Sequence, residues 1–377
     1  MNKGSSLIIG AITLLVIGNS PSVILPFMVG SIEDQFNLTK QGVGNLMTLE
    51  LSMMAISSIF FSSININLNF LLKSLMGITI VLLGYFITSI TDTLVQLYLI
   101  RTISGLACGL LISSGHSILA SNPNPEKSYA FFSLTQSVVG ALIIYISGIV
   151  LASGGFSYFF ISLGFFYLLL TPSLYFLRNL EFNLEEQSKE KASGKLKVTI
   201  LLILGVLLFE VSSGGMWAFN ERLGIEFIGI TVNEVGLILA LSTLSGLLAP
   251  PLVLFIGDAF GRKKPIILSV LAIFLCFVFI LKLPSYSSYF IGNIIWYFFF
   301  TLTVIYVLAA TASISPSGRL ASWLNASILV GMSLSPSVFG FILEVSSFEN
   351  LLPFLSIFIA ITLICIFLTK DELDKTV

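Results

Sequence analysis

Apolar runs of about twenty residues, separated by short polar stretches, follow one another along most of this chain, and each is long enough to cross a bilayer as a helix. Only 10% of the residues are charged and 56% are hydrophobic, whereas soluble domains carry about 25% charged residues. A transmembrane β-barrel would need short segments of alternating polarity instead. The pattern therefore predicts an all-α polytopic membrane protein.

Charges and turn residues divide the chain into twelve predicted spans, at residues 6–30, 42–64, 71–91, 95–117, 128–152, 156–177, 198–219, 233–256, 265–283, 287–311, 320–344 and 350–369. The break between the fifth and sixth spans rests on the stretch Ala-Ser-Gly-Gly, because glycine favours turns. The longest polar stretch lies in the middle of the chain. It predicts a six-helix bundle at residues 1–180, a central loop at 181–196 and a second six-helix bundle at 197–377.

Basic residues fall unevenly on the two sides of these spans. Of the 18 Lys and Arg residues, fourteen lie on the side of the N-terminus and the central loop, three on the other side, and Arg101 within a span. The positive-inside rule then predicts a multi-pass protein of the plasma membrane, the inner membrane in a bacterium, with both termini cytoplasmic. The formal net charge of −1 gives no reason to expect nucleic-acid binding.

The two halves of the chain resemble each other at an offset of 191–192 residues. Val43-Gly44 aligns with Val235-Gly236, and Gly140 aligns with Gly331. Because six helices per half preserve the topology, the repeats should be related by a pseudo-two-fold axis along the membrane normal. Transporters built this way place the substrate site between the halves, near mid-membrane.

The stretch Gly-Asp-Ala-Phe-Gly-Arg-Lys-Lys-Pro at 257–265 resembles the signature loop of the Major Facilitator Superfamily, which lies between the second and third helices of a half. Asp258, Gly261, Arg262 and Lys263 match it. The resemblance implies the twelve-helix fold of that family and a role for this loop in gating the cytoplasmic side. Arg101, with spaced glycines after it, is similar to a second feature of the family.

Two departures from the family pattern bear on function. The first half has lost the signature loop, since residues 64–73 read Ile-Asn-Ile-Asn-Leu-Asn-Phe-Leu-Leu-Lys. The fifth span also lacks the Gly-Pro pair that is typical of drug/proton antiporters. This second absence weighs against an antiporter without excluding one.

Charged residues inside predicted spans are costly, about 2.5–3.5 kcal/mol each at a helix centre, so they are the first functional candidates. Glu50 and Arg101 each lie six residues into a span from the outer side, roughly 9 Å deep at 1.5 Å per residue. Opposite charges at equal depth predict an ion pair. It is either a brace of the first half or a proton- or substrate-linked pair, and Arg101 could instead extend to the surface.

Glu210 lies about twelve residues into the seventh span, near the middle of the bilayer. No base of the second half sits at that depth, so we expect the carboxyl group to carry protons or to bind a cationic group of the substrate. The alternative is a neutral glutamic acid that is hydrogen-bonded to a neighbouring helix. Trp217 follows on the same helix face. The glycines at 214 and 215 should let the helix bend. Asn19, beside the expected kink at Pro21, lies at the equivalent depth of the first span.

Three further readings concern residues near the span ends. His116, the only histidine, is more typical of a hydrogen-bonded structural residue than of a proton relay. Trp217, Trp296 and Trp323 are interpreted as anchors at the membrane interface, and Trp217 could instead form a cavity wall by its depth. Glu221 and Arg222, at the outer end of the seventh helix, are expected to be solvated or to line a gate.

These features favour a secondary active transporter that moves a small, amphipathic organic molecule by alternating access and proton coupling, with export slightly favoured. The alternatives are a proton-coupled uptake permease and a non-transporting membrane sensor of transporter fold. An enzyme is disfavoured because the acids are scattered. No Walker-type motif indicates ATP. We expect protons and membrane lipids as partners, a monomer, no cofactor, and no metal site at the three cysteines, which lie within apolar runs.

Overall fold

The computed structural model describes residues 3–63, 70–122, 124–178, 196–257, 259–314, 319–369 and 373, and this part of the chain is helical almost throughout. In the first half the helices are α1 (Lys3–Gly18), α2 (Ser20–Val23), α3 (Leu25–Phe36), α4 (Lys40–Ser63), α5 (Phe70–Thr88), α6 (Leu94–Ala120), α7 (Pro125–Leu168) and η1 (Thr171–Leu177). In the second half they are α8 (Leu196–Ala218), α9 (Asn220–Arg222), η2 (Leu223–Ile228), α10 (Val232–Ser245), η3 (Gly246–Leu248), α11 (Ala249–Ile256), α12 (Lys263–Lys282), α13 (Tyr286–Ile314), α14 (Arg319–Val345), η4 (Phe348–Asn350) and α15 (Leu352–Leu368).

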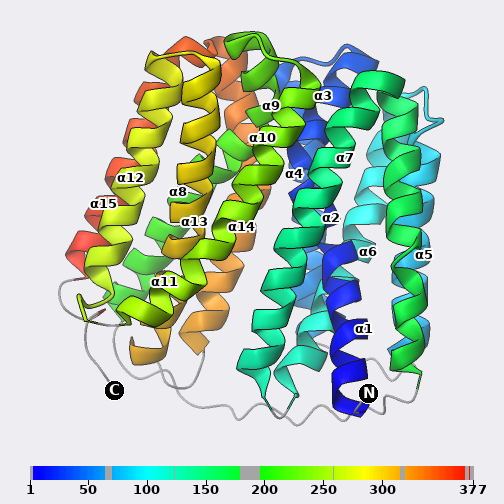
Figure 1. Ribbon diagram of the computed structural model, residues 1–377, viewed down its shortest axis with the longest axis horizontal. Helices are drawn as coiled ribbons and strands as arrows, with labels where there is room; N and C mark the ends of the chain where they lie inside the picture. The colour runs from blue at the N-terminus through cyan, green and yellow to red at the C-terminus, as the bar shows by residue number, and fades with distance from the viewer. Residues whose placement is uncertain are drawn as a thin grey trace.

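These helices form two bundles that stand side by side, α1–α7 and α8–α15 (Figure 1). We call the face where α1 begins and α15 ends the terminal face, and the face where α3 leads into α4 the distal face. Within the described residues, ten helices are long and apolar enough to cross a membrane. One of these ten, at Lys127–Leu177, contains both the fifth and the sixth predicted spans. The first predicted span is not among the ten, because it is divided into the shorter helices α1, α2 and α3. The twelve predicted spans are therefore present.

The first span is not one straight helix. It breaks at Asn19 and again at Ile24, each break followed by a proline near the start of the next segment. Proline lacks the N–H that would continue the helical ladder and clashes with the preceding turn. The kink expected at Pro21 is thus present, and Pro26 adds a second. The span also extends beyond the predicted end at residue 30, because α3 continues to Phe36.

The fifth and sixth spans are separated at Gly155, as the Ala-Ser-Gly-Gly stretch predicted. Its φ of 69° and ψ of −161° lie outside the helical region, in a conformation that glycine adopts readily. The predicted sixth span is less regular than expected at its end. It leaves the α-helix at Leu168 and finishes as the 3₁₀ helix η1, which has Pro172 in its first turn.

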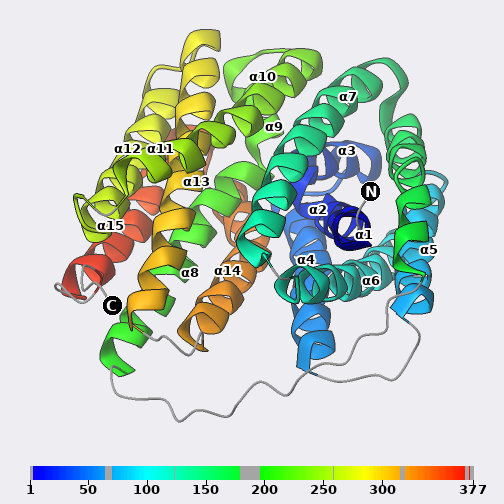
Figure 2. The same ribbon diagram turned by 60° about the horizontal axis from the view of Figure 1, so that its bottom comes forward.

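Two helix crossings join the halves near the distal face, and glycines make both possible. A Cβ on Gly44 of α4 would lie 2.3 Å from the carbonyl oxygen of Pro336 in α14, and one on Gly340 would lie 2.4 Å from that of Lys40. A Cβ on Gly148 of α7 would lie 2.9 Å from the Cα of Gly236 in α10. These positions repeat at the offset found in the sequence, so the two crossings are related by the pseudo-two-fold axis. The four crossing helices line the seam between the bundles (Figure 2).

The predicted boundaries at residues 180 and 197 stay predictions, because residues 179–195 lie outside the described part of the chain.

Candidate functional site

A cavity of about 450 Å³ lies between the two bundles at mid-depth. Both halves contribute to its walls, from Asn19, α2, α4, α6 and α7 on one side and from α8, α10, α13 and α14 on the other. Asn19, Glu210 and Trp217 line it, three of the five central residues singled out in the sequence. Its volume falls within the range of small-molecule sites, about 300–1,000 Å³.

Glu210 is the only Asp, Glu, Lys or Arg side chain among the residues that line this cavity. It is 2% exposed, and its Oε1 atom has no hydrogen-bond partner among the described residues. The position of α14 explains how it is held: a Cβ on Gly331 would lie 2.7 Å from the Cβ of Glu210. This glycine lets α14 pack directly against the turn that carries the carboxyl group.

The expectation that the glycines after Glu210 bend the seventh helix is wrong. α8 runs without interruption to Ala218, and the break comes at Phe219. The glycines instead admit α14, since a Cβ on Gly215 would overlap the ring of Phe339. Their function is close packing between α8 and α14, which the sequence pattern does not distinguish from a flexible hinge.

An aromatic wall covers the second-half side of the cavity. Trp217 packs against Trp296 and Tyr297 with ring centroids 6.3 and 5.7 Å apart, and Phe300 extends the wall. The Nε1 atom of Trp217 donates a hydrogen bond of 2.9 Å to the Ser22 carbonyl, which ties the two halves together. Trp296 is 2% exposed, so its interpretation as an interface anchor is wrong.

The first-half side of the cavity carries fewer hydrogen-bonding groups. Asn19 donates from Nδ2 to the Leu15 carbonyl at 2.8 Å, a bond within its own helix. His116 lines the cavity and stacks on Tyr129 with ring centroids 5.7 Å apart. Ser22, Gln136 and Ser137 complete the polar part of this side.

Glu50 and Arg101 form an ion pair, with Nη1 and Oε1 3.3 Å apart and both side chains 1% exposed. Arg101 also donates from Nη2 to the Gly84 carbonyl at 2.7 Å. Its guanidinium lies over the rings of Tyr85 and Phe160, 5.4 and 5.6 Å from their centroids. The pair thus connects α4, α5, α6 and α7 inside the first bundle. Neither residue is among those that line the central cavity.

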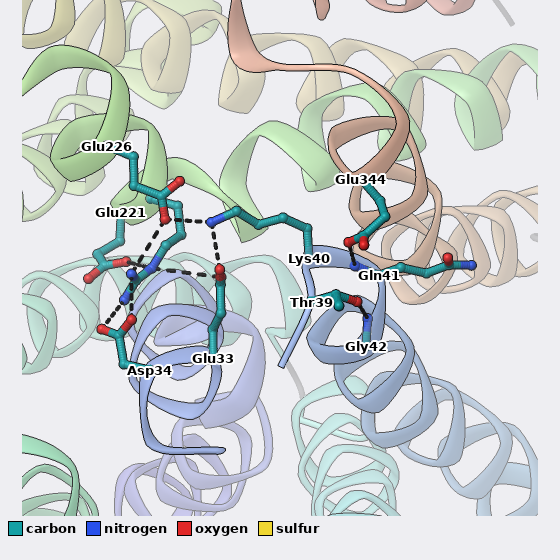
Figure 3. A network of polar contacts seen from close by, with 10 residues as sticks. Glu33, Asp34, Thr39, Lys40, Gln41, Gly42, Glu221, Glu226 and Glu344 are labelled. Carbon is teal, nitrogen blue, oxygen red and sulfur yellow. Dashed lines mark hydrogen bonds and ion pairs between the residues drawn. The ribbon is translucent and has the colours of Figure 1, made fainter. Parts of the chain in front are cut away.

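A polar network closes the distal face between the bundles, and we call it the distal latch (Figure 3). It consists of Glu33, Asp34, Lys40, Glu221, Arg222 and Glu226. Arg222 of the second half binds Asp34 of the first with two parallel hydrogen bonds of 2.9 and 2.7 Å. Lys40 of the first half contacts Glu33 at 2.6 Å and Glu226 of the second half at 2.5 Å.

The sequence reading found only part of this latch. Glu221 and Arg222 are 0% and 6% exposed, so the expectation that they are solvated is wrong, and the alternative that they line a gate stays a prediction. Glu33, Asp34 and Lys40 were not singled out. A signal was available for Lys40, which is one of the three bases predicted on that side of the membrane. The left-handed conformation of Asn37, with φ of 49°, ends α3 and turns the chain so that these residues meet.

Further contacts seal the seam beside the latch. Ser337 of α14 donates from its backbone N–H to Thr48 Oγ1 of α4 at 2.9 Å, and its hydroxyl hydrogen-bonds Asn45 Oδ1 at 2.5 Å. Between described residues, every hydrogen bond and ion pair that joins the two halves lies on the distal side of Glu210. The cavity is therefore closed toward the distal face.

Glu221 gives the latch a pH dependence. Burial raises its pKa to about 7 even though Arg222 lies 2.9 Å away, and the negative charges of Asp34 and Glu33 act in the same direction as burial. If opening returns the carboxyl group to water, its pKa falls toward the ordinary 4.5. The closed face then binds the proton more tightly, so acidification favours closure.

We expect the closed population to fall as the pH rises through the window from about 4.5 to about 7, by at most roughly tenfold per pH unit. Spin labels at Asp92 and Glu349, exposed positions near the distal ends of α6 and α15, would report the separation of the bundles by electron–electron distance measurement. Glu221→Gln should flatten this pH profile. A profile that Glu221→Gln leaves unchanged would assign the dependence to another group, of which Glu33 is the nearest candidate, because burial also raises its pKa.

The loop that resembles the family signature lies at the terminal face, between α11 and α12, as predicted. Gly261 has a φ of 70°, which permits the tight reversal. Arg262 directly precedes α12. Lys263 donates to the Phe367 carbonyl at 3.0 Å, so it caps the last turn of α15. Asp258 lies outside the described residues, and the gating role of the loop stays a prediction.

Comparisons with known proteins agree with this architecture. The sequence profile of the Major Facilitator Superfamily matches residues 10–225. A mutant form of the nucleoside transporter NupG is similar in structure, with a TM-score of 0.70 at 13% sequence identity, over 98% of this chain and 100% of that one. A bacterial homologue of the human lysosomal transporter Spinster, in an inward-facing and occupied conformation, has a TM-score of 0.71 at 15% identity, over 99% and 98% of the two chains. No curated protein sequence matches the chain.

Proposed function

Because the chain belongs to the Major Facilitator Superfamily, a family of membrane transporters, we propose that it moves small, amphipathic organic molecules through the central cavity in exchange for protons. The observation that carries this proposal is Glu210, a single buried carboxyl group in an otherwise uncharged cavity between the halves. Burial disfavours the charged form of a carboxyl group, so Glu210 can hold a proton in one state and release it in another.

Alternating access follows from the placement of the latch. Among the described residues, the hydrogen bonds and ion pairs between the halves lie only on the distal side of Glu210, so opening the latch and closing the terminal side would expose the same cavity to the other compartment. We propose that the terminal face is cytoplasmic, since Lys and Arg concentrate on that side. The loop that carries Gly261, Arg262 and Lys263 belongs to this proposal as its cytoplasmic gating element, and the bundle boundaries at residues 180 and 197 belong to it as the limits of the two moving halves.

Export is the proposed direction, because the cavity is apolar and aromatic and suits lipophilic molecules. Proton-coupled uptake would use the same cavity, with protons and substrate moving in the same direction. The two are separated by the sign of the coupling: protons entering the vesicle should accompany substrate leaving it if the protein is an exchanger.

Glu210→Gln should abolish ligand-coupled proton movement, because glutamine keeps the shape of the side chain and cannot carry a proton. The purified protein in liposomes, with an internal pH-sensitive dye and an imposed pH gradient, would be tested against a panel of amphipathic compounds. The matched control is Glu349→Gln, an exposed acid at the distal end of the second half, which should keep wild-type flux. Undiminished coupled flux in Glu210→Gln would remove Glu210 as the coupling group.

A further inference from the structure

The two halves present different kinds of surface to the central cavity. On the first half, four polar side chains of the wall are only half-buried: Asn19, His116, Gln136 and Ser137. On the second half, the half-buried residues of the wall are aromatic or aliphatic: Tyr297, Phe300, Val304, Ile328, Leu329 and Met332. Its polar side chains, such as Glu210 and Thr243, are almost fully enclosed. An occupant therefore meets hydrogen-bonding groups on one side and an apolar surface on the other.

Two of the half-buried polar side chains present an atom whose hydrogen-bonding role is fixed. Asn19 uses Nδ2 in its bond to the Leu15 carbonyl, so Oδ1, an acceptor, is left for the cavity. Gln136 has its Oε1 atom enclosed, so Nε2, a donor, is left. Among the described residues, neither Asn19 Oδ1 nor Gln136 Nε2 has a hydrogen-bond partner, and neither atom is enclosed. Both atoms can therefore bind an occupant directly.

The cavity offers an occupant no charge that it can contact. Glu210 is the only Asp, Glu, Lys or Arg side chain among the described residues of the wall, and it is 2% exposed. Moving an ion from water into an apolar site is costly unless an opposite charge meets it there. The His116 ring and the Ser137 hydroxyl can each donate or accept a hydrogen bond and place no restriction on the sign of a partner. An uncharged occupant with its own donor and acceptor fits these walls.

The second-half wall favours a flat shape. The rings of Tyr297 and Phe300 are both half-buried, with centroids 6.1 Å apart and planes tilted by 50°. Aromatic side chains pack on other flat rings in offset-stacked or edge-to-face arrangements. The cavity volume of about 450 Å³ is that of a small-molecule site. A compound of one or two fused rings therefore suits this wall.

We propose that the substrates are uncharged, flat heteroaromatic compounds that carry an N–H donor and a carbonyl acceptor on one edge. This inference rests on the proposed transport function and names the substrate class of the same cavity. The N–H group donates to Asn19 Oδ1, the carbonyl accepts from Gln136 Nε2, and the ring packs on Tyr297 and Phe300. Because the first half binds the edge and the second half binds the ring, the site is complete only when both halves contribute.

Four compounds with the same fused ring system would test the charge and the edge separately. 2-Quinolone is uncharged and carries an N–H and a carbonyl group side by side. N-methyl-2-quinolone keeps the carbonyl and loses the donor. N-methylquinolinium carries a permanent positive charge, and quinoline-2-carboxylate carries a negative one. Calorimetry on the purified full-length protein in nanodiscs of zwitterionic lipid, with empty nanodiscs as the blank, would measure the four affinities.

We expect 2-quinolone to bind most tightly of the four. Loss of the N–H group in N-methyl-2-quinolone should weaken binding roughly 2- to 10-fold, the range for one uncharged hydrogen bond. The cation and the anion should each bind at least about tenfold more weakly, because each loses its water without gaining an ionic partner. The cation is the sharper comparison, since a carboxylate that an occupant could reach would attract it.

Two variants assign the contacts. Asn19→Leu should weaken the binding of 2-quinolone and leave that of N-methyl-2-quinolone nearly unchanged, because only 2-quinolone has the donor for Oδ1. Gln136→Leu should weaken both roughly 2- to 10-fold, because both compounds keep the carbonyl. Asn325→Leu is the control, because Asn325 is exposed and does not line the cavity. Wild-type affinity for 2-quinolone in both folded variants would overturn the assigned contacts.

The inference is overturned if 2-quinolone does not bind, if N-methylquinolinium binds as tightly, or if N-methylation leaves the affinity unchanged. The comparison of ligands needs no variant, so a misfolded variant cannot hide the answer. Binding in the expected order with no ligand-coupled proton movement in liposomes would reject the transport function and leave the ligand class in place. Coupled movement driven by the cation alone would keep the transport function and reject the substrate class.

Discussion

Arg222→Gln is expected to open the distal face at neutral and higher pH. The variant leaves Glu221, which is 0% exposed, without the cation beside it. Removing one member of a buried ion pair costs about 3–5 kcal/mol in typical cases. The bond from Arg222 to Asp34 adds little, because the Asp34 side chain is 69% exposed. We therefore attribute the loss of closure mainly to the unpaired Glu221.

The pH dependence makes this prediction specific. Arg222 lowers the pKa of Glu221, so in Arg222→Gln this pKa in the closed state rises above the wild-type value of about 7. The closed variant then holds Glu221 protonated, and the cost of closure falls as the pH falls toward the ordinary carboxyl pKa of 4.5. Labels at Asp92 and Glu349 should therefore report an open distal face for Arg222→Gln at pH 8 and a largely closed one at pH 5. Glu221→Gln added to Arg222→Gln should restore closure at pH 8.

Arg178→Gln is the matched control for this experiment, because Arg178 is an exposed arginine at the terminal face that lies over the Tyr175 ring. It should leave the distal distance unchanged. Closure of Arg222→Gln at pH 8, or an equal effect of Arg178→Gln, would show that the latch does not hold the halves together.

Arg101→Met is expected to destabilise the first bundle strongly. It would leave Glu50, 1% exposed, as an isolated buried carboxylate, and would remove the bond to the Gly84 carbonyl. The expected cost is about 3–5 kcal/mol, as for other truncated buried pairs. Thermal unfolding in detergent would show it as a lower midpoint, and Glu50→Gln added to Arg101→Met should recover most of the loss. Lys263→Met, which removes an exposed contact at the end of α15, is the control.

The same variants decide between the two roles considered for this pair. Because the pair lies outside the cavity lining, the folded fraction of the double variant should keep wild-type ligand affinity and ligand-coupled proton movement. This result would show that the ion pair between Glu50 and Arg101 only stabilises the first bundle. A double variant that is stable but has lost coupled proton movement would instead place the pair in the proton pathway.

The sequence predicted the fold because membrane insertion imposes strong local rules. Apolar runs give the spans, the glycine at 155 separates two of them, and the repeat offset gives the symmetry. It also predicted that Glu50 and Arg101 meet, since each was expected at the same depth in one bundle. These conclusions depend on position along a helix axis, which the sequence records directly.

Other features depend on which helix faces which, and the sequence does not record that. The glycines after Glu210 were expected to bend α8, whereas they admit Phe339 of α14 from more than a hundred residues away. Trp296 was placed at the membrane interface because the sequence does not show which rings pack against it. The distal latch joins residues 33–40 to residues 221–226, and only the turn at Asn37 and the break at Phe219 bring these together.

The central claim is that one cavity is exposed to one compartment at a time under control of the distal latch. Ser137→Cys places a thiol on the half-buried cavity wall, while the three native cysteines are buried. In oriented proteoliposomes at pH 8, a membrane-impermeant maleimide should modify it from the terminal face and not from the distal face. With Arg222→Gln added, maleimide applied from the distal face should also modify the cysteine. Equal modification from both faces in the parent, or no change with Arg222→Gln, would contradict the account.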